Sequence, residues 1–303
     1  MNNNAIKLRI VFIGCVKSTA YILRKMIAEN QIPVGVVTKS VSKFNSDFED
    51  LTPICKEHGI PFHYVDNVND EDSLAFVKSC NPDIIYCFGW SQLLKSELLS
   101  IPPKGCVGFH PAALPYNKGR HPIIWALALG LKETASSFFM MDEKADNGAI
   151  VSQGKIVIAD DDTALTLYDK ILEVAGKQVV AFTKDFEMGS VKLVPQSDKT
   201  GNSWRKRSAK DGLIDWRMSC KAIYNLVRAL TRPYPGAQFV VNGVCKTVWK
   251  AEIVKDSDSK LQNIESGKIL KVVSPTDFYV KAYDGVIHII DCDDVELKEG
   301  DYL

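Results

Sequence analysis

The residues of this sequence best suited to acid–base chemistry are a histidine at the end of an apolar run and an aspartate in an acidic turn. His110 ends GCVGFH and precedes a proline, and Asp146 stands within MDEKADNGAIV. A carboxylate beside an imidazole orients the ring, and such a pair can move a proton to or from a substrate. Each residue also has an ordinary explanation, because many histidines belong to cores or surfaces and Asp-Asn-Gly is a turn signal. As a pair, they predict an acid–base enzyme.

The first turn of the chain lacks the glycine patterns that bind nucleotide cofactors. It reads GCVKST, from Gly14 to Thr19. A dinucleotide-binding turn has the pattern GxGxxG, and a phosphate-binding loop ends in Gly-Lys followed by Ser or Thr. The turn therefore argues against an enzyme that uses a nicotinamide cofactor or ATP.

The elements that would position His110 and Asp146 alternate between strands and helices. Apolar, β-branched runs predict strands, and amphipathic runs predict helices. The expected strands are 8–14, 33–38, 60–65, 82–89, 105–110, 135–142 and 148–158, and the expected helices are 18–29, 49–58, 71–80, 121–130 and 163–187. This alternation is typical of a Rossmann-like open parallel α/β sheet, where ligands bind beyond the carboxyl ends of the strands. Two central strands end at Phe88-Gly89-Trp90 and at Phe109-His110-Pro111, and these ends mark the expected site.

The last third of the chain has a different pattern. Residues 196–216 are polar with little periodicity and predict a linker, whereas 218–231 has the apolar spacing of a helix. Five or six short strands with turn residues between them follow, which predicts a small OB-like β-barrel. We therefore expect a catalytic domain at 1–195, a linker at 196–216 and a C-terminal barrel domain at 217–303.

Composition disfavours several classes of protein. Lys and Arg together number 37, as do Asp and Glu, and this zero net charge argues against a nucleic-acid partner. The eight cysteines form no CxxC pair and no zinc-ligand spacing, which indicates reduced thiols in a cytoplasmic protein and no metal site. The N-terminal stretch predicts a first strand and not a signal peptide, and no apolar run is long enough to cross a membrane.

Long ordered motifs resemble those of the folate-dependent formyltransferases. The first is GCVGFHPAALPYNKGRHPIIWALALGLKETASSFFMMDEKADNGAIVSQ, and the later ones are RKRSAKDGLIDW and YNLVRALTRPYPGA. The later motifs look like the linker and C-terminal domain of methionyl-tRNA formyltransferase and its sugar-modifying relatives. The resemblance covers nearly the whole chain.

The resemblance implies transfer of a formyl group from 10-formyltetrahydrofolate to an amine. Negative charge develops on the formyl oxygen when the amine attacks, so a hydrogen-bond donor must face that oxygen. His110 matches the family's histidine and would supply the donor. Asp146 matches the family's aspartate, which pairs with the histidine and helps to remove the amine's proton, through water.

Gly108 departs from the family's motif, which has an asparagine two residues before the histidine. That asparagine also donates to the formyl oxygen, and loss of one such donor typically costs roughly 3–4 kcal/mol at the barrier. Three interpretations remain open. The amide of Asn117, in the same loop, replaces it; or His110, Asp146 and water are sufficient; or the chain is a catalytically weak folate- or nucleotide-binding protein. Asn117 is equally consistent with an ordinary turn residue.

The resemblance also places the pterin of the folate along the loop after the fourth strand and under the acidic turn. The matching positions are Gly89, Trp90, Gln92, Leu94, Asp142 and Glu143. Trp90 is equally consistent with core packing. Arg120 and His121 stand where a helix begins and either bind a phosphate or cap that helix.

The charge of two segments of the chain bears on which amine accepts the formyl group. Methionyl-tRNA formyltransferases carry a basic insertion after the second strand, but residues 39–58 here hold three basic residues and four acidic ones. From Trp204 onward the chain has 16 Lys and Arg against 14 Asp and Glu. These counts favour a UDP- or dTDP-linked amino sugar, the substrate class of the similar sugar N-formyltransferases, with initiator tRNA as the alternative. A homodimer is possible by the same resemblance.

Overall fold

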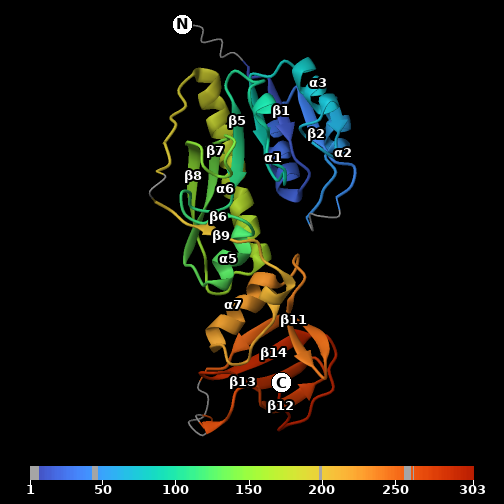
Figure 1. Cartoon of the computed structure of the whole chain (residues 1–303), viewed down its shortest axis with the longest axis vertical. Helices are drawn as coiled ribbons and strands as arrows, with labels where there is room; N and C mark the ends of the chain where they lie inside the picture. Colours follow the sequence, from blue (N-terminus) through green and yellow to red (C-terminus); the bar gives the residue numbers. More distant parts are fainter. Residues whose placement is uncertain (1–6, 43–46, 198–199, 256–260, 262) are drawn as a thin grey trace. The chain divides into compact units, whose positions relative to one another are not determined.

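The computed structural model describes residues 7–42, 47–197, 200–255, 261 and 263–303 (Figure 1). Contacts divide the chain into two compact units, each built from several segments. The first unit comprises Met1–Gly119, Thr134–Ile156 and Asp169–Ser203, and the second comprises Arg120–Glu133, Val157–Tyr168 and Trp204–Leu303. The domain boundaries expected from the sequence, at 195 and 216, stay a prediction. Residues 1–6, which precede the expected first strand, lie outside the described residues.

The first unit is built on a seven-stranded sheet of order β3-β2-β1-β4-β5-β7-β8. Its strands are β1 (Ile10–Ile13), β2 (Gly35–Thr38), β3 (Phe62–Tyr64), β4 (Ile84–Cys87), β5 (Cys106–His110), β7 (Glu133–Met140) and β8 (Ile150–Val157). The pairs from β3 to β5 are parallel, as expected. The expectation of an all-parallel sheet is wrong for β7, which runs antiparallel to β5. Apolar content predicts a buried strand but does not set its direction, so the sheet is mixed.

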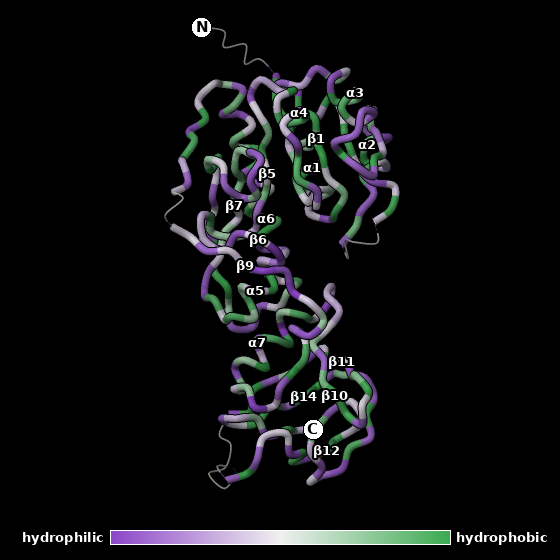
Figure 2. The backbone as a smooth tube through the Cα atoms, viewed as in Figure 1, coloured by the Kyte–Doolittle hydropathy of each residue, from purple (hydrophilic) through white to green (hydrophobic). Residues whose placement is uncertain are grey.

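Both faces of this sheet are buried. Ile10 and Phe12 of β1 belong to one apolar cluster, and Val11 and Ile13 belong to another, as the two-residue period of a strand requires. The tube through β1 is accordingly hydrophobic in Figure 2. The helices of this unit are α1 (Lys17–Ala28), α2 (Thr52–Glu57), α3 (Glu71–Ser79) and α4 (Ser96–Leu99), and α6 (Ala164–Met188) lies mostly within it. The one-turn helix α4 was not expected from the sequence.

The second unit contains a five-stranded antiparallel sheet of order β10-β11-β14-β13-β12. Its elements are α5 (Pro122–Ala128), the 3-10 turn η1 (Ala209–Gly212), α7 (Cys220–Leu230), β10 (Ala237–Val241), β11 (Val244–Ile253), β12 (Ile269–Ser274), β13 (Asp277–Lys281) and β14 (Val286–Cys292). Helix α7 packs on β11 and β14 (Figure 1). The sheet is not closed, because its edge strands β10 and β12 do not pair with each other, so the expected barrel is not confirmed. Short strands with turns between them are common to open and closed sheets.

The cysteines, all within the described part of the chain, are free thiols, and seven of the eight are buried. Burial raises the pKa of Cys106 to about 12 and that of Cys55 to about 11, the latter with a further contribution from Asp50. Thiols with raised pKa values are poor nucleophiles, so these side chains act as small core residues. In the described ranges, no helix has the length and apolar character needed to cross a membrane.

Candidate active site

The carboxyl ends of β4 and β5 lie side by side. Cys87 pairs with Gly108 in a parallel register, so Phe88 and Gly89 follow one strand while Phe109 and His110 complete the other. His110 is the last residue of β5 and is 5% exposed. The sequence therefore predicted correctly that this histidine stands at the carboxyl edge of the sheet.

Both ring nitrogens of His110 face hydrogen-bond acceptors. Nε2 lies 2.8 Å from the backbone carbonyl oxygen of Asn117, and Nδ1 lies 3.7 Å from Oδ2 of Asp146. A carbonyl oxygen has no proton to donate, so Nε2 must carry the hydrogen of that bond. The distance to Asp146 is too long for a direct hydrogen bond but places the carboxylate beside the ring. The structure thus brings His110 and Asp146 together, as their sequence positions predicted.

Asp146 lies in the turn between β7 and β8 and has a left-handed backbone, with φ of 57°. Aspartate and asparagine enter this region more readily than most residues. Its Oδ2 accepts a hydrogen bond from the backbone N–H of Gly119 at 3.0 Å, and its side chain is 16% exposed. The carboxylate is therefore oriented from two sides, by His110 and by β6 (Lys118–Gly119).

Asn117 reaches His110 through its backbone and not through its side-chain amide. Its φ of 63° is again left-handed, and its own N–H donates to Oδ1 of Asn202 at 2.9 Å. This conformation turns the Asn117 carbonyl toward the ring of His110. The expected role of the Asn117 amide as a donor to substrate stays a prediction, and the geometry gives the backbone of this residue a separate use.

No side chain fits at Gly108 without movement of its neighbours. Gly108 pairs with Phe139 across the antiparallel β5–β7 ladder. A Cβ built at Gly108 would lie 2.7 Å from Cζ of Phe139 and 3.0 Å from Cγ of Met141. The ring of Phe139, which is 4% exposed, therefore fills the space beside Gly108. An apolar ring, that of Phe139, therefore lies beside the glycine that stands where the family has asparagine.

The expected folate-binding loop is held firmly at its start. Gly89 has φ of 65°, and a Cβ there would collide with the side chain of Val16 and lie 2.7 Å from Oγ1 of Thr19. The Thr19 hydroxyl donates to the carbonyl of Phe88 at 2.7 Å. Gly89 can thus offer a ligand only backbone groups, in a position set by helix α1.

Gln92, also expected to bind folate, joins this loop to the one after β3. Its Oε1 accepts from the backbone N–H of Val68 at 3.0 Å and from Nε1 of Trp90 at 3.3 Å. Its Nε2 donates to the carbonyl of Asp66 at 2.9 Å. The polar atoms of the Gln92 amide are therefore engaged by protein groups, and the residue's evident action is to shape the loop.

The other expected folate positions differ in their access to solvent. The Trp90 ring is half-buried against a core cluster, with Nζ of Lys39 5.2 Å from the ring centroid. Leu94 is 2% exposed, so its side chain belongs to the core. Asp142 and Glu143 are exposed, and Oδ1 of Asp142 accepts the backbone N–H of Lys144 at 2.8 Å. Folate contacts at these positions stay a prediction.

Within the second unit, His121 begins helix α5. It has φ of 57°, and its Nδ1 accepts the backbone N–H of Arg207 at 3.3 Å. Burial lowers the pKa of His121, and the positive charges of Arg120, Arg207 and Lys206 lower it further. His121 occupies the N-cap position, but its side chain makes no capping hydrogen bond to α5 and bonds to the backbone of Arg207 instead. Phosphate binding by Arg120 or His121 stays a prediction.

Two residues in the predicted linker contact the site, and sequence reasoning missed both. Asn202 bonds to the N–H of Asn117, and Gln196 bonds to the turn that carries Asp146. A polar segment of low periodicity predicts a linker whether or not the segment packs on a site. The signal for their role is spatial, and neither spacing nor residue type revealed it.

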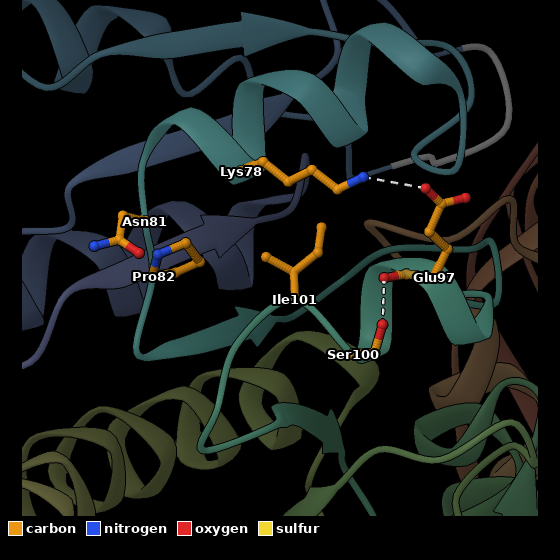
Figure 3. Close-up of a pocket in the computed structure, with 6 residues that line it drawn as sticks. All are labelled: Lys78, Asn81, Pro82, Glu97, Ser100 and Ile101. Atoms are coloured by element: carbon orange, nitrogen blue, oxygen red, sulfur yellow. Dashed lines mark hydrogen bonds and ion pairs between the residues drawn. The ribbon is translucent and has the colours of Figure 1, made fainter.

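A hollow of about 360 Å³ lies at the opposite edge of the sheet, near the residues that precede β4. Figure 3 shows its lining, which includes Lys78, Pro82 and Glu97. Lys78 forms an ion pair with Glu97 at 3.2 Å, and the Ser100 hydroxyl donates to the Glu97 carbonyl at 2.9 Å. These polar groups satisfy one another, so the hollow has no evident ligand chemistry and is separate from His110.

Comparison with known families gives two matches along the chain. The model of the formyl transferase family matches residues 1–183, and the model of the formyl transferase C-terminal domain matches residues 206–298.

Solved structures with the same fold span nearly the whole chain. WlaRD, a sugar 3N-formyl transferase crystallised with dTDP and 5-N-formyl-THF, is 18% identical with a TM-score of 0.68, over 94% of this chain and 98% of that one. An N-formyltransferase from Helicobacter canadensis, in complex with folinic acid and dTDP-3-aminofucose, is 16% identical with a TM-score of 0.68, over 94% and 99%. HypX from Aquifex aeolicus, in complex with tetrahydrofolic acid, is 17% identical with a TM-score of 0.66, over 96% of this chain and 45% of that one. At these identities the likeness shows a shared fold.

Proposed function

Because the chain belongs to the formyl transferase family, we propose that it transfers a formyl group from 10-formyltetrahydrofolate to the amine of a nucleotide-linked amino sugar. The observation that carries the proposal is the pairing of the buried His110 with the partly buried Asp146 at the carboxyl edge of the sheet. An imidazole N–H and a carboxylate supply the donor and the acceptor that amine formylation requires. Structural neighbours crystallised with folates and with dTDP or a dTDP-sugar support the same choice of co-substrate and acceptor.

In the proposed reaction, the neutral amine attacks the formyl carbon, and charge develops on the formyl oxygen. The Nε2 hydrogen of His110 is bonded to the carbonyl of Asn117 in this structure, so its donation to the formyl oxygen requires that the substrate oxygen replace that carbonyl as the acceptor. The Asp146 carboxylate accepts the amine's proton through water, and the proton passes to N10 of the leaving folate. One C–N bond forms and one breaks, with no change of oxidation state.

Charge supports a sugar acceptor over initiator tRNA. In the segment after β2, Lys39 lies over the Trp90 ring, and Asp50 bonds to the hydroxyls of Thr52 and Tyr64. These contacts describe a packed loop with acidic groups and not a basic arm; residues 43–46 of the segment lie outside the described ones. A tRNA acceptor stem would require a surface rich in Lys and Arg. The identity of the sugar, its base and a homodimeric state stay predictions.

The test is tetrahydrofolate release from 10-formyltetrahydrofolate with a panel of acceptors. The panel holds UDP- and dTDP-linked 3-amino and 4-amino sugars, with charged initiator tRNA beside them. Release with an amino sugar and none with tRNA is the expected result. Release with tRNA alone would reverse the choice of acceptor. Folate binding without release for any acceptor would instead indicate a binding protein.

A further inference from the structure

One side-chain amide spans the turn that carries Asp146. Nε2 of Gln196 donates to the backbone carbonyl of Asp146 at 3.0 Å and to that of Gly148 at 2.7 Å. The two acceptors lie on either side of the turn's centre, so a single amide group ties both sides together. Gln196 is 50 residues away in sequence from Asp146, and its contact is therefore a tertiary one.

The turn has little freedom to move. Asp146 holds a left-handed backbone, and a Cβ at Gly148 would overlap the carbonyl of Met140 on β7. The Asp146 carboxylate must at the same time meet the N–H of Gly119 and lie beside Nδ1 of His110. Because a displacement of about 1 Å in a reacting group can cost roughly 100-fold in rate, the hold on this turn bears directly on turnover.

The orientation of the Gln196 amide follows from its partners. Two carbonyl oxygens face Nε2, and a flipped amide would place Oε1 against them, acceptor to acceptor. The observed orientation leaves Oε1 buried without a hydrogen-bond partner among the described residues. Gln178 is similar away from the site: its Nε2 donates to the carbonyl of Ser136 and to the hydroxyl of Ser152, and its Oε1 also lacks a partner among the described residues. An unpartnered oxygen is thus no sign of function by itself, and Gln178 serves as a matched control.

We propose that Gln196 is a positioning residue for formyl transfer, which fixes the Asp146 turn so that the carboxylate faces His110 and the incoming amine. The inference rests on the proposed function for its effect on rate. Its geometric part, that Gln196 sets the placement of Asp146 beside His110, stands on the hydrogen bonds alone.

The test compares Gln196→Glu with Gln178→Glu. Each change keeps the shape of the side chain and replaces the donating nitrogen with an oxygen. That oxygen repels the carbonyls of Asp146 and Gly148 in one variant and the carbonyl of Ser136 in the other, where the Ser152 hydroxyl can donate to it. We expect Gln196→Glu to lower kcat at least 10-fold with the KM for folate within about threefold, and Gln178→Glu to lower the thermal midpoint with kcat nearly unchanged. In the Asp146→Asn background, Gln196→Glu should add no further loss, because both changes act on one carboxylate.

A second measurement does not depend on activity. The ring signals of His110 in NMR spectra should shift in Gln196→Glu and in the uncharged variant Gln196→Ala, and should stay in place in Gln178→Glu. Unchanged His110 signals and kcat within threefold in a folded Gln196→Glu protein would overturn the inference; Gln196→Ala provides the second variant if the first does not fold. An inactive wild-type protein would defeat the proposed function instead, and the NMR comparison would still decide the role of Gln196.

Discussion

The imidazole Nε2 of His110 donates a hydrogen bond of 2.8 Å to the backbone carbonyl of Asn117. The hydrogen proposed to stabilise the formyl oxygen is thus bonded to the main chain of the next loop in this structure. Asn117 contributes this carbonyl whatever its side chain is, provided that the backbone keeps its left-handed conformation. The backbone of Asn117, which bonds to His110, therefore has a role separate from the one proposed for its side-chain amide. The sequence alone could not distinguish these two roles.

Asn117→Gly should keep turnover within a few-fold of wild type. Glycine adopts the left-handed conformation at no steric cost and preserves the carbonyl that meets His110, while the side-chain amide is removed. Initial rates at saturating folate and acceptor measure the effect. A loss of more than 10-fold with unchanged stability would show that the amide itself takes part, as a replacement for the asparagine missing at position 108.

His110→Ala and Asp146→Asn should each reduce turnover by about 100-fold or more, because each removes one half of the donor–acceptor pair. Folate affinity, measured by isothermal titration, should change little. His58→Ala, on a partly exposed histidine beyond helix α2, is the control and should have no effect. Activity within a few-fold of wild type in either site variant would defeat the assignment.

Gly108→Asn should destabilise the protein and should not raise activity. The new side chain would press on Phe139 and Met141, and overpacking of this kind typically costs about 1–3 kcal/mol. Adding Phe139→Ala makes room but removes a buried ring, so the loss of stability in the double variant should be smaller than the sum of the losses in the two single variants. A stable single variant with higher turnover would mean that the Phe139 ring gives way easily and that the missing amide limits the rate.

His121→Asn should make the second unit less sensitive to acid. The folded protein holds the pKa of His121 below its ordinary value of about 6.5 through burial and neighbouring positive charges. The unfolded chain therefore takes up a proton here at a pH where the folded one does not, and stability falls as the pH drops from about 7 through the folded pKa. The variant should show a smaller decrease in thermal midpoint between pH 7.5 and 5.5. Equal decreases in thermal midpoint for the wild type and the variant would contradict the lowered pKa assigned to His121.

Arg228→Met should cost about 3 kcal/mol of unfolding free energy. Arg228 is 5% exposed, and its guanidinium donates to the carbonyls of Asp162 at 2.8 Å and Ala159 at 3.2 Å. Methionine keeps much of the length but removes the charged donor from the carbonyls of Asp162 and Ala159. Urea unfolding measures the loss, and Arg217→Met, on an exposed arginine, should leave the midpoint in place. Equal midpoints for the two variants would show that the Arg228 bonds contribute little.

Sequence patterns predicted the parts of this molecule that depend on local periodicity. The strand that ends at His110 and the long helix α6 follow from apolar spacing, and strand-end position marked His110 as a site residue. The antiparallel direction of β7 and the open second sheet did not follow, because pairing is set by contacts between distant segments. Phe139 beside Gly108 and Gln196 under the Asp146 turn are further cases, since no local pattern places a side chain against a backbone far away in sequence.

The most direct measurement follows the formyl carbon itself. The protein is incubated with 10-formyltetrahydrofolate labelled with ¹³C in the formyl group and with the nucleotide-linked amino sugar that supports turnover, and the products are read by NMR. The account predicts a labelled formamide carbon on the sugar nitrogen, formed by the wild-type protein and not by Asp146→Asn. Label that appears as free formate, or that stays on the folate in the presence of every amino sugar, would contradict it.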